Sequence, residues 1–389
     1  MHSFGLPGIL AFVIQWLAIA FAAWGASSLP TTTPPTVTGF PATATVAALP
    51  TSTSIPSPTA TRTVTPTANA TPTASPRGTG PVEPAKPPSA SAAALKNGRF
   101  AGVLWGAYVN PDETWRGTED DKRKVQEFEA LIGRKIAIDM RYVHWHEDWA
   151  AWPLPIDTWD ADSGRIPVVT WGSGAPPSTR TIASGKEDGW IRERARASRS
   201  LGAFFLRPLW EMNGDWSPWN AAGDLERTKD YIAAWRRVHR LFQEEGATNA
   251  IFVWSPNAED IPQEPWNHWM NYYPGDAYVD WVGMDGYNWG TTQPWHRWRS
   301  LATVFGPLYR DFAGQKPIMV AETASTEVGG DKAEWIRDAL ASIKDMPHIK
   351  AVVWFHANKE TDWRVNSSQA SLQEFRALAH DPYFGAMRE

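Results

Sequence analysis

The sequence predicts a single (β/α)8 barrel, preceded by an apolar N-terminal segment and a Thr/Pro-rich linker. Short apolar strands alternate with amphipathic helices after Leu95, and eight such units fit into about 290 residues, a usual size for a closed barrel. Several of these strands are continuous apolar runs, which are typical of parallel sheets covered on both faces. The sequence contains no Gly-rich phosphate-binding loop that would favour a nucleotide-binding fold instead.

Residues 1–28 are almost uninterruptedly apolar from Phe4 to Trp24, and Gln15 is the only strongly polar side chain in that run. Two interpretations stay open for this segment. Small residues near Ala26 fit a cleaved secretory signal, whereas the length of the run fits an uncleaved membrane anchor. Both predict export, so we expect the protein outside the cell, either secreted or attached to the membrane or cell wall through its N-terminus.

Residues 29–95 are rich in Thr, Pro, Ala and Ser, and Arg62 is the first formal charge of the chain. This stretch has few aromatic residues and neither a helical nor a strand period, so it lacks the apolar surface needed to form a core. We expect a disordered, extended stalk whose Thr residues are open to O-glycosylation. Asn69 matches the N-glycosylation pattern. The folded domain is expected over residues 96–389.

The composition excludes several classes of function. The net charge is −5 and no basic stripe is present, which argues against a nucleic-acid partner. Cysteine is absent, so the protein has no disulfide, no thiolate nucleophile and no cysteine metal site. The 24 tryptophans favour binding surfaces lined by aromatic rings.

Most of the expected strands are followed by an expected helix. Strands are expected at residues 102–108, 135–142, 166–171, 203–211, 250–254, 279–285, 317–322 and 349–355. Helices are expected at residues 119–132, 187–201, 226–245, 297–312, 331–344 and 368–380. The first of these helices shows the apolar spacing of Val125, Phe128 and Leu131, and the long third helix is closed by Gly246.

The fourth strand, at 203–211, combines polar and apolar faces. Alternate residues of a strand share a face, which here groups Phe205, Arg207, Leu209 and Glu211. A plain core does not tolerate Arg and Glu without partners, so this face is expected to carry function. Two tryptophans, Trp216 and Trp219, follow the strand. Sugars stack on aromatic rings while a carboxyl group protonates the glycosidic oxygen, so this combination suits a carbohydrate.

Two glutamates end strands of the predicted barrel, where barrel sites form. Glu211 closes the fourth strand and Glu322 the seventh, where Glu322 shares a face with Ile318 and Val320. Retaining glycosidases use two carboxyl groups about 5–5.5 Å apart, one as nucleophile and one as acid/base. Glu211 and Glu322 are therefore the predicted catalytic pair.

Four motifs carry a specific resemblance: RPLWEMNGDWSPW, YIAAWRRVHRLFQEEGATNAIFVWSPN, YYPGDAYVDWVGMDGYNW and KPIMVAET. Together they resemble glycoside hydrolase family 26, a family of retaining β-glycanases that are chiefly endo-β-1,4-mannanases. The resemblance covers nearly all of residues 100–380. It implies a barrel that hydrolyses polysaccharide without a cofactor, and we expect a monomer.

The resemblance also implies residue roles. Glu211 would be the acid/base and Glu322 the nucleophile. Tyr287 would donate a hydrogen bond to the nucleophile, and Arg207 would help stabilise the negative charge of the carboxylates. Trp354 would be the platform under the cleaved sugar, and Trp216 the aromatic that follows the acid/base. The remaining side chains expected at the substrate are His144, Trp210, Trp254 and Trp289. For Trp171, Trp254 and Trp289, packing at the barrel rim is an equal alternative.

One residue departs from the family pattern, because Trp210 stands where family mannanases place His before the acid/base. Indole only donates a hydrogen bond, whereas imidazole also accepts one, so the departure bears on the sugar that is recognised. We rank β-1,4-mannan first, mixed-linkage β-glucan second and β-xylan third. An endo-acting groove is expected to be lined by Trp216, Trp219, Trp289 and Trp354.

Two other classes of function remain as alternatives. His144-Trp145-His146 places two imidazoles on one strand face, so a zinc hydrolase could use them with His356 and Asp285, although no metal is the preferred expectation. A non-catalytic carbohydrate-binding protein would also suit the stalk and the tryptophans. Apart from the metal alternative, Asp285 is expected to orient loop backbone. Three tryptophans are expected in the core: Trp235, Trp281 and Trp335.

Overall fold

The computed structural model describes residues 92–111, 118–146 and 152–384. The predicted N-terminal segment, residues 1–28, and residues 29–91 of the predicted linker lie outside these residues, whereas residues 92–95 of that linker lie within them. Within them, eight parallel strands close into a barrel in sequence order, which confirms the predicted fold class. The strands are β1 (Leu104–Asn110), β2 (Ile138–His144), β3 (Ile166–Ser173), β4 (Phe204–Pro208), β5 (Ala250–Trp254), β6 (Trp281–Asp285), β7 (Ile318–Thr323) and β8 (Ile349–Ala357).

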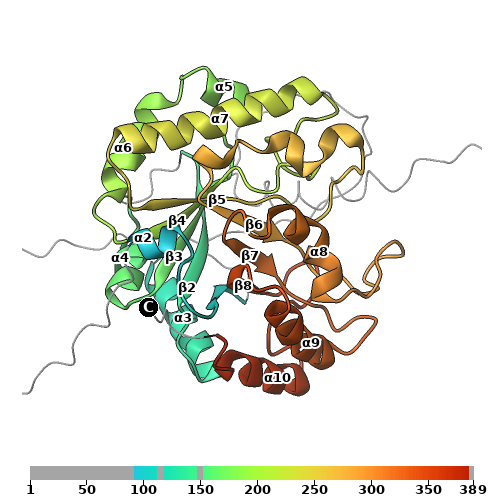
Figure 1. Cartoon of the computed structure of the whole chain (residues 1–389). Coiled ribbons are helices and arrows are strands. Elements are labelled where there is room, and N and C mark those ends of the chain that lie inside the picture. Colours follow the sequence, from blue (N-terminus) through green and yellow to red (C-terminus); the bar gives the residue numbers. More distant parts are fainter. Residues whose placement is uncertain (1–91, 112–117, 147–151, 385–389) are drawn as a thin grey trace, which may run out of the picture. The chain divides into compact units, whose positions relative to one another are not determined.

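Helices surround the barrel, as Figure 1 shows. They are α2 (Ala92–Lys96), α3 (Thr118–Ile132), α4 (Pro155–Asp162), α5 (Thr179–Ala183), α6 (Asp188–Ser198), α7 (Leu225–Glu244), α8 (Leu301–Phe312), α9 (Lys332–Lys344) and α10 (Gln369–His380). Three short 3-10 helices connect β5 to β6: η1 (Pro265–Asn267), η2 (Trp269–Tyr272) and η3 (Asp276–Tyr278). In the described part of the chain, no helix combines the length and the apolar character that a membrane span requires.

Three α-helices of the described residues, α2, α4 and α5, were not among the predicted elements, and α2 lies at the end of the predicted linker. All three are short, since α2 and α5 hold 5 residues each and α4 holds 8, so none of them offers a long apolar period. Helix α8 begins at Leu301 rather than at 297, because Ser300 caps it by accepting a hydrogen bond from the backbone of Thr303.

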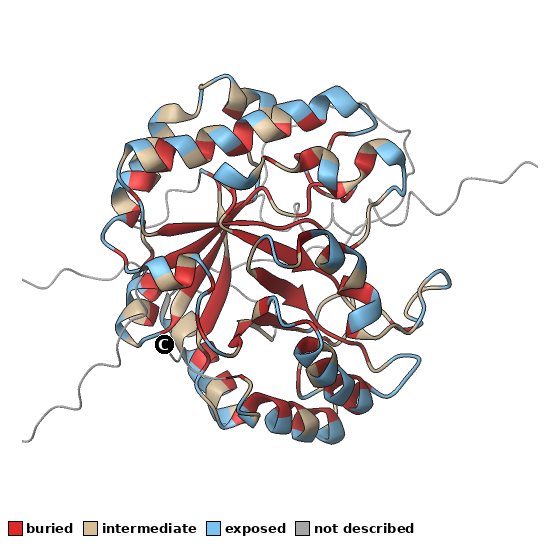
Figure 2. Cartoon of the chain, viewed as in Figure 1, coloured by how far each residue is buried: buried red, intermediate tan, exposed pale blue. Residues whose placement is uncertain are grey.

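The core has two layers because side chains alternate across each strand. Phe205 of β4 packs inside the barrel, whereas Phe204 and Leu206 pack against the helices. Figure 2 shows the strands buried along their length and the helices buried on their inner faces only. The expected core positions of Trp235, Trp281 and Trp335 are confirmed, since all three are buried.

Helix α2 closes one end of the inner layer. Its Leu95 is 1% exposed and belongs to the inner cluster with Phe100 and Trp281. The indole of Trp281 donates a 3.0 Å hydrogen bond to the backbone oxygen of Leu95. The residues just before 96 therefore contribute to the barrel core.

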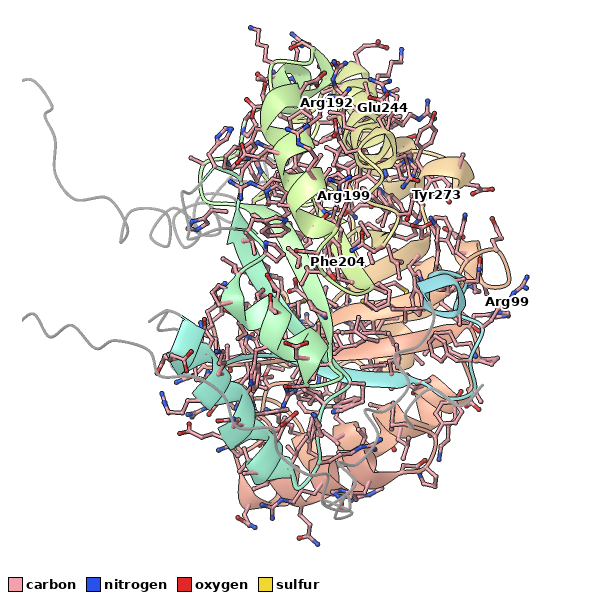
Figure 3. The ribbon with its side chains drawn as sticks, turned by 90° about the vertical axis from the view of Figure 1, so that its left-hand side faces the viewer. Arg99, Arg192, Arg199, Phe204, Glu244 and Tyr273 are labelled. Carbon is pink, nitrogen blue, oxygen red and sulfur yellow. The ribbon has the colours of Figure 1, made fainter. Side chains whose placement is uncertain are left out.

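Ion pairs join neighbouring helices on the outside of the barrel. Arg192 of α6 pairs with Glu244 and Glu245 at the end of α7, and Figure 3 shows Arg192 and Glu244 side by side. These groups are partly exposed, so each pair adds little to stability.

Candidate active site

Arg207 of β4 is the central charge at the mouth of the barrel. Its side chain is 0% exposed, and its guanidinium donates to Thr170, Asp285 and Glu322. The bond to Asp285 measures 2.8 Å and the bond to Thr170 measures 3.0 Å. Thr170 and Asp285 hold the buried guanidinium in a fixed orientation. One of its remaining N–H groups therefore points to Glu322.

Glu322 of β7 receives three hydrogen bonds from the barrel. Arg207 and Tyr142 donate to Oε1, the latter at 2.5 Å, and Tyr287 donates to Oε2 at 2.7 Å. Burial and the charge of Glu322 raise the pKa values of both tyrosines, so their hydroxyl groups stay protonated as donors. The expected contacts of Glu322 with Tyr287 and Arg207 are present in the structure.

The predicted strand face of Glu322 was wrong. Ile318 and Val320 pack in the outer layer, whereas the carboxylate of Glu322 turns to the mouth. The pairing of β7 with β8 shifts register between Val320 and Thr323. An irregularity of this kind re-aims the side chains beyond it, which simple alternation does not anticipate.

Glu211 does not lie on β4, which ends at Pro208. Leu209 and Glu211 have φ values of 48° and 53°, in the left-handed region that side chains rarely adopt. Leu209 packs in the outer layer rather than beside Arg207, so the predicted grouping of alternate residues fails there. The backbone N–H of Glu211 donates a 2.7 Å bond to Ser255, which stabilises this turn.

The two glutamates differ in their electrostatic surroundings. Burial raises the pKa of Glu211 to about 7, and the negative charge of Glu322 adds to this rise. The indole of Trp216 opposes the rise by donating a 2.8 Å hydrogen bond to Oε2 of Glu211. Near neutral pH, Glu211 therefore has a substantial protonated fraction and can act as an acid.

Trp210 lies at the same mouth, half-buried. Its ring centroid is 5.5 Å from that of Tyr142 and 4.9 Å from that of Trp219, and the guanidinium of Arg207 lies 5.6 Å from the ring. Trp219 itself is only 4% exposed and donates to the backbone oxygen of Trp210. The expectation that Trp219 lines an open groove is therefore wrong; it supports Trp210 from behind.

Two predicted substrate contacts are contradicted by burial. Trp354 is 2% exposed and packs against Trp335 and Phe375 on the helix side of β8. Trp254 is 0% exposed and packs on Tyr273. Alternation along β8 and β5 directs these indoles outward, so neither is a platform under a sugar.

The side chain of Phe355, one residue after Trp354, points to the opposite face of β8. Its ring stacks on Tyr108 at 4.8 Å and lies 5.7 Å from the ring of Tyr287. Trp363, in the segment after β8, also packs on Tyr287, with 5.0 Å between ring centroids. Neither residue was predicted at the site. Strand alternation could have identified Phe355, whereas the loop position of Trp363 left no periodic signal.

Tyr142 was recognised as a strand end but was given no role. It shares the inner face of β2 with Ile138 and Met140, which pack inside the barrel. Strand alternation could have predicted that Tyr142 lies on this face. Its hydrogen bond to Glu322 could not be predicted in this way, because the two residues are 180 positions apart in the chain. Asp285 was expected to orient loop backbone, but its carboxylate accepts hydrogen bonds from the side chains of Arg207 and Ser255 instead.

The imidazoles of the His144-x-His146 motif do not converge on a metal site. His146 is exposed and bonds to Glu187 at 2.6 Å, while His144 remains half-buried at the end of β2. His356 accepts a hydrogen bond from the backbone of Val365 and faces Phe128 on the helix side. Across residues 92–111, 118–146 and 152–384, no group of three or more His, Asp or Glu side chains could hold a metal ion.

Packing decides the alternative for Trp171, while Trp289 stays a candidate for contact with the substrate. Trp171 is 2% exposed and stacks on Trp145 with centroids 4.2 Å apart, so it is rim packing. Trp289 is half-buried, and its ring lies 6.0 Å from Tyr287 and 4.8 Å from Trp363. The side chains brought together at the mouth include Arg207, Glu211, Glu322, Tyr142, Tyr287, Trp210, Trp216 and Trp289.

The fold and the site define a class. The chain forms a closed parallel barrel with two buried glutamates at its mouth, and one of them accepts hydrogen bonds from tyrosine and arginine side chains. This is the architecture of a glycoside hydrolase. The model of glycosyl hydrolase family 26 matches residues 199–383, a range that contains both glutamates. The chain belongs to this family.

Relatives with curated names agree with this assignment. Endoglucanase H of Acetivibrio thermocellus is 39% identical over 268 residues, which cover 67% of this chain and 29% of that protein. Mannan endo-1,4-beta-mannosidase A and B of Caldalkalibacillus mannanilyticus is 42% identical over 88 residues, which cover 21% of this chain and 16% of that protein. The chain thus spans less than a third of these relatives.

Solved structures share the fold. The catalytic domain of a family 26 endo-beta-1,4-mannanase from Bacillus sp. JAMB-750 superposes with a TM-score of 0.55 at 20% identity, covering 76% of this chain and 89% of that one. A modular endo-beta-1,4-mannanase from Cellulomonas fimi gives a TM-score of 0.54 at 18% identity, covering 76% and 75%. At these identities the likeness concerns the barrel architecture.

Proposed function

We propose that the barrel hydrolyses a β-linked polysaccharide by double displacement, with retention of configuration at the anomeric carbon. The observation that carries this proposal is the contrast between the two buried glutamates. Glu322 accepts hydrogen bonds from Arg207, Tyr142 and Tyr287, whereas burial raises the pKa of Glu211 to about 7. One carboxylate is thus prepared to attack and the other carboxyl group to donate a proton.

In the first step, a carboxylate oxygen of Glu322 forms a bond to the anomeric carbon. The bond between that carbon and the glycosidic oxygen breaks, and Glu211 transfers its proton to the leaving oxygen. In the second step, Glu211 removes a proton from water, whose oxygen displaces Glu322 from the sugar. Both carboxyl groups then return to their starting protonation states.

Substitution of each glutamate tests these roles. Glu322→Ala should abolish hydrolysis, because no covalent intermediate can form. Glu211→Ala should retain more activity on aryl glycosides with good leaving groups than on polysaccharide, since those leaving groups need less protonation. Near-native activity of either variant on polysaccharide would refute the assignment. So would inversion of configuration in products followed by NMR at early times.

For the polymer, we propose endo-acting cleavage of β-1,4-mannan first. Three relatives named as mannan endo-1,4-beta-mannosidases match 21% of the chain each. A β-glucan is the second candidate, because the match to a protein named Endoglucanase H extends over 268 residues. Trp210 beside Tyr142 and Arg207 gives this second candidate a structural basis, since indole cannot accept a hydrogen bond from a sugar hydroxyl.

Initial rates on galactomannan, glucomannan, mixed-linkage β-glucan and xylan decide between these polymers. The same panel applied to Trp210→His measures what the substitution contributes to selectivity. Cleavage of mixed-linkage β-glucan without cleavage of mannan would reverse the ranking. A wild-type protein that binds polysaccharide but hydrolyses none of the panel would instead support a non-catalytic carbohydrate-binding protein.

We also propose that this activity operates outside the cell. The support is the sequence alone: an apolar run at residues 4–24 followed by a Thr/Pro-rich stretch before the barrel. Fractionation of expressing cells tests it, with the protein expected in the medium, membrane or wall fraction. Recovery of the full-length protein only from the cytosol would refute it.

A further inference from the structure

A line of aromatic rings leads from the nucleophile to the protein surface. Tyr287 donates to Glu322, and its ring lies 6.0 Å from that of Trp289. The ring of Trp289 lies 5.1 Å from that of His296, which in turn lies 5.9 Å from the ring of Trp295. We call these four residues, Tyr287, Trp289, His296 and Trp295, the aromatic line.

Trp295 ends the aromatic line with an exposed indole. It is 52% exposed, whereas most of the tryptophans in the described part of the chain are buried or half-buried. It belongs to the segment between β6 and α8, and the segments that follow barrel strands form the mouth where Glu211 and Glu322 lie. An exposed indole at this position leaves a large apolar surface facing water beside the proposed site.

The segment that carries Trp295 is held in place by its own contacts. Thr292 donates a 2.8 Å bond to the backbone oxygen of Trp289 and bonds to His296 at 3.1 Å. The backbone N–H of Thr291 donates a 3.0 Å bond to Val328, in the segment after β7. Gly290 allows this approach: its φ is +54°, and an added Cβ would lie 1.9 Å from the backbone oxygen of Val328.

We propose that Trp295 is a binding platform for a sugar unit of a linear β-linked polysaccharide, remote from the bond that is cleaved, and that Trp289 lies along the path between them. This inference rests on the proposed function. The flat apolar face of a hexose stacks on indole, and rings placed in succession from Glu322 outward suit a polymer better than a short ligand.

The test compares long and short substrates on Trp295→Ala. Kinetics are measured on the polymer that the wild type prefers and on an aryl glycoside too short to extend along the aromatic line. The ratio of kcat/KM between polymer and aryl glycoside should fall about 3- to 10-fold, the scale of one aromatic stacking contact. The fall should come from KM for the polymer, and Trp295→Tyr should recover part of it because it restores a ring.

Met270→Ala is the matched control, because Met270 is 45% exposed on η2 but lies outside the aromatic line. It should leave the ratio unchanged. If the wild type hydrolyses polysaccharide and Trp295→Ala keeps the wild-type ratio, the platform is refuted while the proposed function stands. If the wild type hydrolyses nothing, the proposed function fails, and affinity electrophoresis in galactomannan and β-glucan gels decides the platform: retarded wild type with unretarded Trp295→Ala supports it, and equal mobility overturns it.

Discussion

Tyr142 shares one oxygen of Glu322 with Arg207, and this arrangement leads to the first prediction. Tyr142→Phe leaves Oε1 with Arg207 as its remaining protein donor among these contacts, so the carboxylate is less firmly oriented for attack. We expect kcat/KM on polysaccharide to fall about tenfold or more, the scale of a hydrogen bond to a charged group, with the loss mainly in kcat.

Tyr108→Phe provides the control for this prediction. The ring of Tyr108 lies 5.1 Å from that of Tyr142, and its hydroxyl accepts a hydrogen bond from Asn110. Tyr108→Phe also removes a phenolic oxygen next to the site, and we expect a smaller loss of kcat/KM than for Tyr142→Phe. Equal kcat values for wild type and a folded Tyr142→Phe protein would contradict a role for the Tyr142 hydroxyl.

The second prediction concerns the hydrogen bond from Trp216 to Glu211 and its effect on the pH dependence of kcat/KM. Glu211 must be protonated to act as an acid, so kcat/KM should decline as pH rises through about 7. The indole of Trp216 stabilises the charged carboxylate and so lowers the pKa of Glu211. Trp216→Phe removes this donor, and the alkaline limb of the pH–kcat/KM profile should move to higher pH. A limb that moves to lower pH, or does not move, would contradict this account.

At the scale of elements, Lys332 connects α9 to the segment after β8. It is 0% exposed, and its ammonium donates to the backbone oxygens of Asp362 and Arg364 and to the hydroxyl of Ser367. This segment also carries Trp363, which packs on Tyr287. Lys332→Met should lower the free energy of unfolding by about 2 kcal/mol or more, since buried acceptors lose their donor. It should also reduce hydrolysis through the displaced ring of Trp363.

Lys344→Met, at the other end of α9, is the matched control. Lys344 pairs with Asp381 near the surface, and such pairs contribute about 1 kcal/mol or less. Urea unfolding and initial rates should therefore show little change for Lys344→Met. Similar losses of stability in both variants would show that the buried hydrogen bonds of Lys332 do not account for the loss of stability in Lys332→Met.

For the whole molecule, the contribution of α2 sets the boundary of the folding unit. A chain that begins at Ser91 retains Leu95, whereas a chain that begins at Arg99 loses it together with the acceptor of Trp281. The first truncation should keep the melting temperature and the specific activity on soluble substrate. The second should lose about 2 kcal/mol or more of stability, the usual cost of removing a buried leucine.

Thermal unfolding of both truncated chains, compared with the full chain, measures this difference. A large drop in melting temperature for the chain that begins at Ser91 would mean that earlier residues stabilise the barrel. Reduced activity of that chain confined to insoluble polysaccharide or whole cells would instead support a spacer role for residues 29–95.

The sequence by itself determined the barrel and pointed to the two glutamates for which we propose a catalytic role. Alternating apolar strands and amphipathic helices are local patterns, and they predicted all eight strands of the barrel. Glu211, Glu322, Arg207 and Tyr287 were identified because strand ends of one barrel converge and because the motifs resemble a known family.

Only the tertiary structure decided which way the side chains near those strand ends point. The left-handed residues Leu209 and Glu211 and the register shift near Glu322 break the two-residue alternation on which sequence reasoning depends. The tryptophans show the same limit: Trp354 and Trp254 are buried against helices, while Trp295 is exposed. Residue type records that an indole is present, but the face it occupies depends on packing between segments far apart in the chain.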